Sequence, residues 1–485
     1  MRRLYVSAAH RSSGKTTVAL GLAAALAAEG TTVQPFKKGP DYIDPMWLGL
    51  AAGRPCRNLD PHLERPDALL AAFARLAAAA DLALVEGNMG LHDGLALDGS
   101  DSNAALARLL GAPVLLVLDA RGMTRGIAAL VLGMQAFDRT VRIGGVVLNR
   151  VGGARHESKL RAAIERYTDV PVLGAIAEDE RLAMSERHLG LVPCAEVDAA
   201  VAQVQAIGHA VAAQVDLRRV REIAAAAPAL AMPATAPLAV VAASPCADPA
   251  SPLAPSRVQR NRADLRIGIA RDRAFGFYYA DDLAALERAG AGLVFIDTLH
   301  DTRLPALDGL VIGGGFPETS LDALAANASL RAALREAIEG GLPTYAECGG
   351  LMYLARSITW RDRTVPMVGV IPGDAVMRTR AVGRGYVELQ ETDAMPWSGG
   401  GGSSAVQGHE FHHSSLENLD PDVRFAYRVQ RGHGVDGRHD GLVLQRLLAS
   451  YAHLRDDAGA AWVSRFVDFV RRSRAERVSP AVLAA

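Results

Sequence analysis

The feature that most constrains the fold lies near the amino terminus, where a strand pattern, a short loop and a helical pattern follow one another. Residues 3–9, Arg-Leu-Tyr-Val-Ser-Ala-Ala, have strand character. Residues 10–17, His-Arg-Ser-Ser-Gly-Lys-Thr-Thr, form the loop, and an alanine- and leucine-rich helical run follows from residue 18. This order predicts an α/β domain that cradles phosphate groups and has a parallel sheet.

The loop carries the groups that a nucleoside triphosphate needs. Backbone amides at the helix start bind phosphate oxygens, Lys15 neutralises the outer phosphates, and the Thr16 hydroxyl can coordinate magnesium. Ala9 replaces the first glycine of the consensus, but the Gly-Lys-Thr-Thr core is intact. We therefore predict an ATP site rather than a solvated basic loop. Its residues are Ser13, Gly14, Lys15, Thr16 and Thr17.

Two further segments place charged side chains after successive strands. Residues 35–45, Pro-Phe-Lys-Lys-Gly-Pro-Asp-Tyr-Ile-Asp-Pro, are expected to follow a second strand, and Glu86 ends a third. Taken singly, such charges are more often solvated loop residues, but the carboxyl ends of parallel strands meet at one edge of a sheet. The predicted metal ligands are Thr16, Asp41, Asp44 and Glu86, and the predicted substrate contacts are Lys37, Lys38 and Tyr42.

A second chemical centre is predicted around Cys348, in residues 345–353, Tyr-Ala-Glu-Cys-Gly-Gly-Leu-Met-Tyr. A strand pattern precedes the cysteine and a helical pattern follows it, as in a nucleophile elbow. A thiol on such a turn projects clear of the sheet, and the amides of the helix N-terminus favour its thiolate. Gly349 and Gly350 let a substrate approach the backbone. The alternative is that Cys348 is a small buried apolar residue.

Glycines upstream of Cys348 are candidates for an oxyanion hole. Residues 310–318, Leu-Val-Ile-Gly-Gly-Gly-Phe-Pro-Glu, form an apolar strand that runs into three glycines. We predict that backbone amides of Gly314, Gly315 and Gly349 stabilise an oxyanion.

Two histidine sites downstream are candidates for the base. His453 ends a strand-like run that starts at residue 442, so it can present an imidazole at a sheet edge to deprotonate the thiol. The alternative is that His453 is a satisfied structural histidine. The other site is residues 408–414, Gly-His-Glu-Phe-His-His-Ser, in which His412 and His413 are the competing bases.

The set GGGFPE, AECGGLMYL, GHEFHHS and SYAHL resembles the glutaminase domain of class I glutamine amidotransferases, in the branch that amidates corrinoid precursors. The resemblance implies that Cys348 attacks the side-chain amide of glutamine and that His453 activates it. Related enzymes carry a glutamate two residues after this histidine, but Arg455 stands there in this chain. A Cys-His dyad is therefore implied, without an identified third member.

The amino-terminal half resembles the ATP-dependent amidoligase domain shared by corrinoid a,c-diamide synthases and dethiobiotin synthetase, through FKKGPDYIDP, EGNMGLHDG, VLNR and ERHLGLVP. The resemblance implies that Asp41 or Asp44, with Glu86, holds the metal and that Asn149 lies near the adenine. An asparagine that ends a strand is also a common turn starter. The whole chain is thus similar to the cobyrinate or hydrogenobyrinate a,c-diamide synthase family.

Length and linker composition predict two domains. At 485 residues the chain is longer than one core usually fills. We expect a synthetase domain over residues 1–223, an alanine- and proline-rich linker over 224–264, and a glutaminase domain over 265–475. Residues 398–404, Ser-Gly-Gly-Gly-Gly-Ser-Ser, predict a surface loop in the second domain.

Charge, hydropathy and cysteine usage predict a cytoplasmic enzyme. Lys and Arg number 52 against 53 Asp and Glu, which argues against a nucleic-acid partner. No apolar run is suited to span a bilayer, and the predicted strand at the amino terminus leaves no room for a signal peptide. The four cysteines, Cys56, Cys194, Cys246 and Cys348, are too far apart for a metal cluster and favour a reduced compartment. A homodimer is compatible with the sequence.

Together the halves predict an amidation that uses glutamine, ATP and Mg²⁺, with an acyl phosphate intermediate that ammonia attacks. The resemblance names the substrate, cobyrinic or hydrogenobyrinic acid, amidated at the a and c acetates in cobalamin biosynthesis. Siroheme or another sirohydrochlorin-type tetrapyrrole is the alternative, because the resemblance assigns no role to residues 432–440, Gly-His-Gly-Val-Asp-Gly-Arg-His-Asp. A second alternative is a regulatory or partitioning P-loop ATPase with a degenerate binding domain, against which the intact Cys348 argues.

Overall fold

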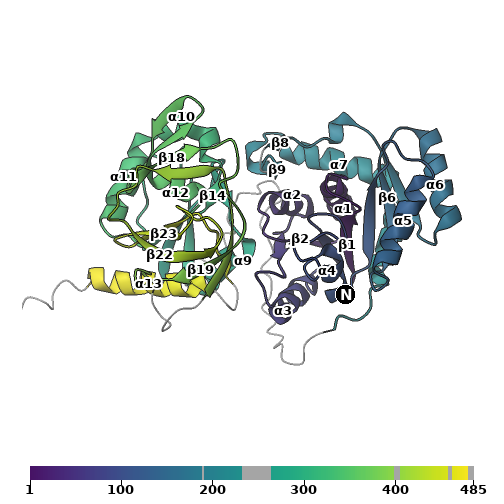
Figure 1. Ribbon diagram of the computed structural model, residues 1–485, viewed down its shortest axis with the longest axis horizontal. Coiled ribbons are helices and arrows are strands. Elements are labelled where there is room, and N and C mark those ends of the chain that lie inside the picture. Colours follow the sequence, from purple (N-terminus) through teal and green to yellow (C-terminus); the bar gives the residue numbers. More distant parts are fainter. Residues whose placement is uncertain (188–189, 232–263, 398–404, 457–460, 479–485) are drawn as a thin grey trace, which may run out of the picture. The chain divides into compact units, whose positions relative to one another are not determined.

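The computed structural model describes residues 1–187, 190–231, 264–397, 405–456 and 461–478 (Figure 1). The chain forms two compact units, Met1–Ser256 and Arg257–Ala485. Most of the predicted linker, the predicted loop 398–404 and Cys246 lie outside the described residues. The domain boundaries at residues 223 and 265 therefore stay predictions.

The amino-terminal unit has a seven-stranded parallel sheet with the order β3-β2-β4-β1-β5-β6-β7, which confirms the predicted α/β class. The strands are β1 (Arg3–Ala8), β2 (Val33–Lys38), β3 (Arg57–Leu59), β4 (Leu82–Glu86), β5 (Val114–Asp119), β6 (Ile143–Val151) and β7 (Val172–Ala177). The helices are α1 (Lys15–Ala28), α2 (Ile43–Ala52), α3 (Pro66–Ala77), α4 (Asn103–Leu109), α5 (Gly126–Phe137), α6 (Ala154–Tyr167), α7 (Ala200–Gln214) and α8 (Leu217–Ala225). Strand β8 (Glu186–Arg187) pairs antiparallel with β9 (Gly190–Leu191).

Helix α1 is fixed by close packing against α7, which in turn fixes the loop before it (Figure 1). A Cβ atom added to Gly21 would lie 2.3 Å from Val211, and one added to Gly208 would lie 2.9 Å from Ala24. Larger residues at these crossing points would push the two helices apart.

One strand boundary in this unit differs from the prediction. Residues 35–38 were expected to follow the second strand, but they form its carboxyl end, so Lys37 and Lys38 are buried strand residues. The sheet accepts Lys37 there because carboxylates from neighbouring elements pair with its ammonium group.

The carboxy-terminal unit has a nine-stranded sheet with the order β12-β10-β13-β15-β24-β23-β22-β19-β20. It is parallel from β12 to β24 and antiparallel from β24 to β20. The strands are β10 (Leu265–Ala270), β12 (Ala291–Ile296), β13 (Gly309–Ile312), β15 (Thr344–Glu347), β19 (Gly383–Glu391), β20 (Ala405–His412), β22 (Arg424–Arg431), β23 (His439–Leu444) and β24 (Leu447–Ser450).

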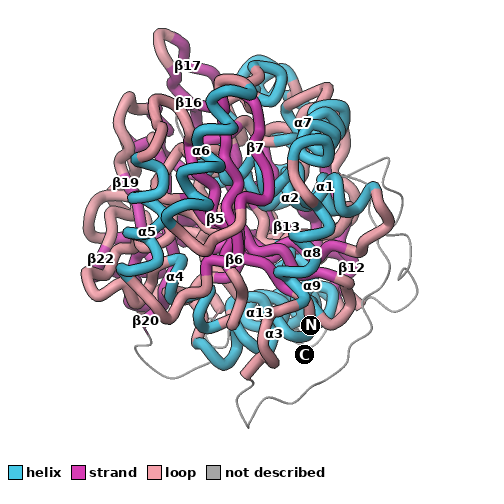
Figure 2. The backbone as a smooth tube through the Cα atoms, turned by 90° about the vertical axis from the view of Figure 1, so that its right-hand side faces the viewer, coloured by secondary structure: helices cyan, strands magenta, loops and turns pink. Residues whose placement is uncertain are grey.

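Smaller sheets and several α-helices complete the described part of this unit. A four-stranded sheet contains β16 (Ala355–Trp360), β17 (Arg363–Pro366), β18 (Ile371–Met377) and β21 (Ser414–Glu417), and β11 (Phe275–Phe277) pairs with β14 (Gly314–Gly315). The helices are α9 (Ala280–Arg288), α10 (Leu321–Ala326), α11 (Ala328–Glu339), α12 (Gly349–Leu354) and α13 (Trp462–Val478). Figure 2 shows helix α6 in front of the strands of the amino-terminal sheet.

The large sheet is buried on both faces because successive residues of its central strands enter different cores. Ala346 of β15 belongs to the core that includes Leu351 of α12, and Tyr345 belongs to the core that includes Phe466 of α13. The Tyr345 ring lies 4.9 Å from the Trp462 ring, which fixes the strand that leads to Cys348.

The strand-like run before His453 is not one strand. Residues 442–448 were expected to be continuous, but Gln445 has a φ of 51° and turns the chain from β23 into the antiparallel β24. Strand β24 lies between β15 and β23, so His453 follows the carboxyl end of an interior strand, next to the end of β15.

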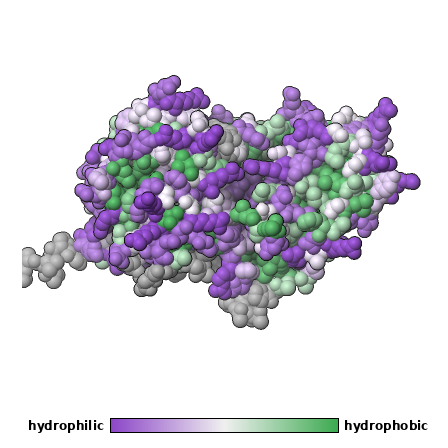
Figure 3. All heavy atoms as spheres, in the orientation of Figure 1, coloured by the Kyte–Doolittle hydropathy of each residue, from purple (hydrophilic) through white to green (hydrophobic). Residues whose placement is uncertain are grey.

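Polar residues cover much of the face seen in Figure 3, with apolar patches between them. None of the helices in the described ranges is long and apolar enough to cross a membrane.

Candidate functional site

The phosphate loop joins β1 to α1 at the centre of the first sheet. Gly14 precedes α1 with a φ of 84°, and a Cβ atom at this position would lie 2.1 Å from the Asn149 side-chain nitrogen. That nitrogen donates a 2.9 Å hydrogen bond to the Ser13 carbonyl. Asn149 therefore supports the loop from the end of β6, while its predicted place near the adenine stays a prediction.

The predicted metal ligands converge on Lys37. Its Nζ lies 2.5 Å from Asp44 Oδ2 and 3.0 Å from Glu86 Oε1. Asp41 is farther away, at 4.0 Å. The Thr16 hydroxyl donates a 2.6 Å hydrogen bond to Glu86 Oε1, which ties the loop to the end of β4.

Burial and mutual charge shift the ionisation of this cluster. Burial lowers the pKa of Lys37, but the charges of Asp44, Glu86 and Asp41 outweigh it and raise the pKa. Burial, followed by the charge of Asp44, raises the pKa of Asp41 to about 7. Burial also raises the pKa of Glu86. Burial raises the pKa of Asp44 too, but the charge of Lys37 and its hydrogen bond outweigh this effect and lower the pKa. Asp41 and Glu86 are thus short of positive charge, and a further cation would stabilise them.

The residues fit a magnesium ion. Glu86 Oε2 is buried and has no hydrogen-bond partner among the described residues. Among the same residues, no group of three or more His, Cys, Asp or Glu side chains could hold a metal ion. Magnesium does not need such a cage, because it is commonly held by one or two carboxylates, waters and substrate phosphates. Thr16, Asp44 and Glu86 offer this hard-oxygen donor set.

The predicted substrate residues lie around the same cluster. Lys37 is directed at the carboxylates, and Lys38 Nζ lies 3.4 Å from Asn88 Oδ1 in the loop after β4. Burial lowers the pKa of Lys38, and that of Lys15 in the phosphate loop. Tyr42 is buried at the start of α2. Contact of Lys37, Lys38 and Tyr42 with a substrate stays a prediction.

Cys348 lies at the sharp turn between β15 and α12. Its φ of 46° and ψ of −100° are rare for a residue with a side chain, and its backbone nitrogen donates a 2.7 Å hydrogen bond to the Ser450 carbonyl. A strained backbone of this kind persists only where its surroundings hold it, and it is typical of a nucleophile elbow.

The His453 imidazole lies beside the residue that precedes the thiol, since its Nδ1 is 3.1 Å from Glu347 Oε2. The ring is also near enough to the Cys348 side chain for the two to interact electrostatically. Burial lowers the pKa of His453, but the hydrogen bonds to Cys348 and Glu347 and their negative charge outweigh it, so the pKa is raised. Because a carboxylate only accepts, Nδ1 carries a proton and Nε2 is left for the sulfur.

A second imidazole, that of His409, stacks on His453 with a centroid separation of 5.0 Å and an interplanar angle of 18°. The two backbones also pair, with hydrogen bonds of 3.1 and 2.8 Å. Burial, followed by the charges of His453 and Arg455, lowers the pKa of His409 well below the usual value. His409 is thus a neutral platform, which the sequence analysis missed although it had singled out residues 408–414.

The two histidines named as competing bases occupy other positions. His412 stacks on Tyr451 at 3.9 Å, and its Nδ1 lies 2.8 Å from the Ser414 carbonyl. The ring of His413 lies 6.0 Å from that of Phe411.

The predicted oxyanion glycines meet at the elbow. A Cβ atom on Gly314 would lie 2.6 Å from His453 Cε1, and one on Gly349 would lie 2.9 Å from the Gly315 backbone nitrogen. Only glycine leaves room for the imidazole and for the close approach of β14 to α12.

Residues 432–440, which the resemblance left without a role, help to fix the segment before His453. The Asp440 carboxylate accepts hydrogen bonds from Ser450 Oγ at 2.8 Å, Tyr451 N at 3.0 Å and Ala452 N at 2.9 Å. Glu410 accepts from the backbone nitrogens of His433 and Gly434 at 2.7 and 2.8 Å. No local sequence pattern predicts these long-range contacts.

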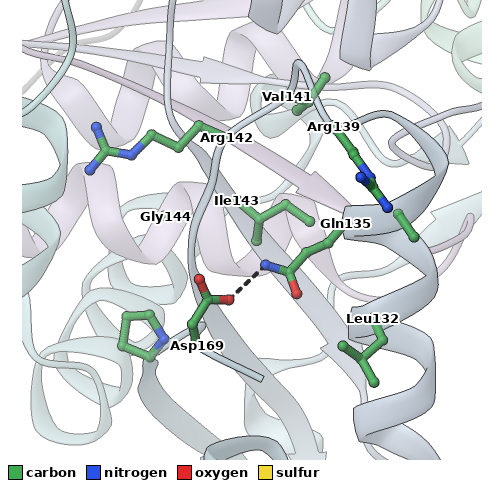
Figure 4. A pocket seen from close by; sticks show the side chains of 10 residues that line it. Leu132, Gln135, Arg139, Val141, Arg142, Ile143, Gly144 and Asp169 are labelled. Carbon is green, nitrogen blue, oxygen red and sulfur yellow. Dashed lines mark hydrogen bonds between the residues drawn. The ribbon is translucent and has the colours of Figure 1, made fainter. Parts of the chain in front are cut away.

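An open pocket of about 690 Å³ lies elsewhere in the amino-terminal unit (Figure 4). It borders Ile143 at the start of β6 and Pro171 just before β7, so it lies at the sheet edge opposite the phosphate loop. Gln135 and Asp169 are joined across it by a 2.9 Å hydrogen bond. None of the predicted site residues lines this pocket.

Two known families match the two halves of the chain. The CobQ/CobB/MinD/ParA nucleotide binding domain matches residues 9–192, and the CobB/CobQ-like glutamine amidotransferase domain matches residues 266–460. The fold and sites therefore define a glutamine amidotransferase domain joined to a nucleotide-binding domain.

Curated relatives of similar length identify a more specific family within this class. Cobyrinate a,c-diamide synthase of Magnetococcus marinus is 44% identical, over 97% of this chain and 97% of the relative. The Methanosarcina barkeri protein of the same name is 39% identical, over 99% and 98%, and that of Listeria monocytogenes serovar 1/2a is 36% identical, over 97% and 100%. The chain belongs to the cobyrinate a,c-diamide synthase family.

Proposed function

We propose that this protein uses glutamine and ATP to amidate the a and c acetate carboxylates of cobyrinate or hydrogenobyrinate in cobalamin biosynthesis. The names of the full-length relatives support this substrate class over siroheme. The observation that carries the chemistry is the strained elbow at Cys348 with the His453 imidazole held next to it by Glu347, because a degenerate binding domain would not need this arrangement.

The Cys348 site would release ammonia from glutamine. The thiolate attacks the side-chain carboxamide carbon, and the resulting oxyanion is stabilised by backbone amides among Gly314, Gly315 and Gly349. His453 gives a proton to the amide nitrogen, the carbon–nitrogen bond breaks, and ammonia leaves while a thioester to Cys348 remains. His453 then takes a proton from the water that attacks this thioester. Hydrolysis of the thioester yields glutamate and restores the thiol.

The phosphate-loop site would activate the carboxylate. A carboxylate oxygen of the substrate attacks the γ-phosphorus of ATP, the bond to ADP breaks, and an acyl phosphate forms. Lys15 stabilises negative charge on the transferred phosphoryl group. Thr16, Asp44 and Glu86, with Asp41 nearby, would hold Mg²⁺, which when bound supplies charge neutralisation at the phosphates. Ammonia then attacks the acyl carbon and phosphate leaves.

The direct test is product analysis by mass spectrometry. The protein is supplied with ATP, Mg²⁺, glutamine and cobyrinate, with hydrogenobyrinate and siroheme in parallel reactions. We expect glutamine- and ATP-dependent conversion of two carboxylates of the corrinoid to amides. Amidation of siroheme alone would identify the alternative substrate, and tetrapyrrole-independent ATP hydrolysis without any amide would favour the regulatory ATPase.

A homodimer, which the sequence allows, belongs to the same proposal. Light scattering of the purified protein gives its molar mass directly, and a mass equal to one chain would contradict the dimer.

A further inference from the structure

The acid that usually follows the glutaminase histidine is replaced here by Arg455, yet a buried carboxylate reaches His453 from another element. We propose that Glu347, the residue before the nucleophile, is the acidic positioning residue of the glutaminase site. This inference rests on the proposed function of Cys348 and His453 and adds a third member to their dyad.

Hydrogen bonds hold the Glu347 carboxylate so that one of its oxygens faces the His453 imidazole. Oε1 accepts hydrogen bonds from the Leu454 backbone nitrogen at 3.0 Å and from the Tyr345 hydroxyl at 2.5 Å. Oε2 lies 3.1 Å from His453 Nδ1. Glu347 is 7% exposed, so water competes little for these contacts.

Arg455 cannot take this role, because a guanidinium is a cation that only donates hydrogen bonds, and its side chain has other contacts. The guanidinium is buried, lies 3.0 Å from Asp281 Oδ2 and stands 5.2 Å from the centre of the Tyr279 ring. The position that carries the acid in related enzymes is therefore part of a buried ion pair that joins this segment to α9.

Glu347 would act through His453 in two ways. It holds the proton on Nδ1, which leaves Nε2 free to take the thiol proton, and it stabilises the imidazolium that forms. Other groups that act on the ring or on its stacked neighbour are Cys348, the neutral His409 and Arg455, whose charge acts on His409. Glu347 is the anion among them that remains when the thiolate has reacted.

Glu347→Gln tests this role with little change of shape. The amide oxygen can still accept from Leu454 and Tyr345, but the amide nitrogen would donate to Nδ1 and impose the tautomer that cannot deprotonate the thiol. We expect kcat for glutamine hydrolysis to fall about 100-fold, with KM changed less than about threefold. The pH profile of Cys348 alkylation by iodoacetamide should move to higher pH, and synthesis from free ammonia should persist.

Glu410→Gln is the matched control, because Glu410 is also buried in this unit but holds backbone nitrogens of His433 and Gly434. It should leave the pH profile of alkylation in place. Glu347→Asp, which restores a carboxylate, should recover part of the lost kcat. An unchanged kcat and alkylation profile in Glu347→Gln would overturn the inference, as would equal losses in both glutamine variants without a shift in the profile. A wild-type protein that releases no glutamate would instead refute the proposed function, while the alkylation profiles would still decide the role of Glu347.

Discussion

The phosphate-loop site and the Cys348 site are built on different principles. In the first, loops and strand ends within the first 86 residues bring charges together, and Thr16 reaches Glu86 across 70 positions. In the second, a strained backbone meets an imidazole and a carboxylate, and His453 lies 106 positions from Glu347. The phosphate-loop site depends mainly on the balance of charges, and the Cys348 site depends on the orientation of its side chains. Substitutions should therefore impair the two sites in different ways.

The largest expected effect is that of Lys15→Ala. Loss of this charge should reduce amidation about a thousandfold or more from both glutamine and ammonia, because both need the phosphoryl transfer. The rates are measured with each nitrogen source, and alkylation of Cys348 by a glutamine analogue should be normal. Lys159→Ala is the matched control, since Lys159 is exposed on α6.

Glu86→Gln separates the role of magnesium from that of Lys15. This variant should also lose amidation from both glutamine and ammonia, but its activity should recover partly at raised Mg²⁺, because Glu86 is a proposed magnesium ligand. Lys15→Ala should show no such recovery. Normal product from ammonia in either variant would place that residue outside the synthetase site.

The next effect concerns the base of the Cys348 site. His453→Ala should lower glutaminase activity about 100-fold or more, because it removes the proton carrier. His412→Ala and His413→Ala should cost much less, since His412 contacts Tyr451 and His413 lies near Phe411. Glutamate release is the measurement, and equal losses in all three variants would remove His453 from its assigned role.

A smaller effect is expected from a substitution that adds a methyl group beside His453 and changes no charge. In Gly314→Ala the new methyl group would lie 2.6 Å from His453 Cε1 and displace the ring. Glutamine hydrolysis should fall about tenfold or more, because misplacement of a reacting group is costly, while synthesis from ammonia stays near normal. Gly133→Ala, in open space on α5, is the control. An unaffected glutaminase rate would show that the imidazole tolerates displacement.

The smallest effect should be on the rate of thiol alkylation at neutral pH. The raised pKa of His453 keeps its imidazolium at neutral pH, and a cationic imidazolium beside a cysteine makes the sulfur more reactive. Iodoacetamide should therefore alkylate Cys348 faster at neutral pH in the wild type than in His453→Ala. This difference should shrink as the pH rises through the raised pKa of His453. Equal rates for the two proteins at neutral pH would contradict this role of the imidazolium.

The difference between the two sites also explains what could be predicted from the sequence. The strand, loop and helix around Lys15 and the elbow around Cys348 are contiguous, so their placement was predicted and the structure confirms it. The end of β2 was predicted wrongly, because Lys37 is acceptable in a buried strand only with Asp44 and Glu86 beside it.

The missed residues depend on register between distant strands. Tyr345 to Glu347 of β15 run beside Leu448 to Ser450 of β24, which brings Glu347 to His453. His409 reaches the site through a backbone pairing with His453, and Asp440 through the turn at Gln445. None of these pairings has a local sequence signal, because hydrophobic periodicity fixes which face a residue occupies and not its partner.

The central claim is that the two sites divide one reaction, and the most direct measurement is amide formation by Cys348→Ser with ATP, Mg²⁺ and cobyrinate. We predict no detectable product from glutamine and a rate close to wild type from free ammonia, because only the ammonia supply depends on the thiol. Loss of both reactions in a folded variant would contradict the division of labour, as would full activity with glutamine.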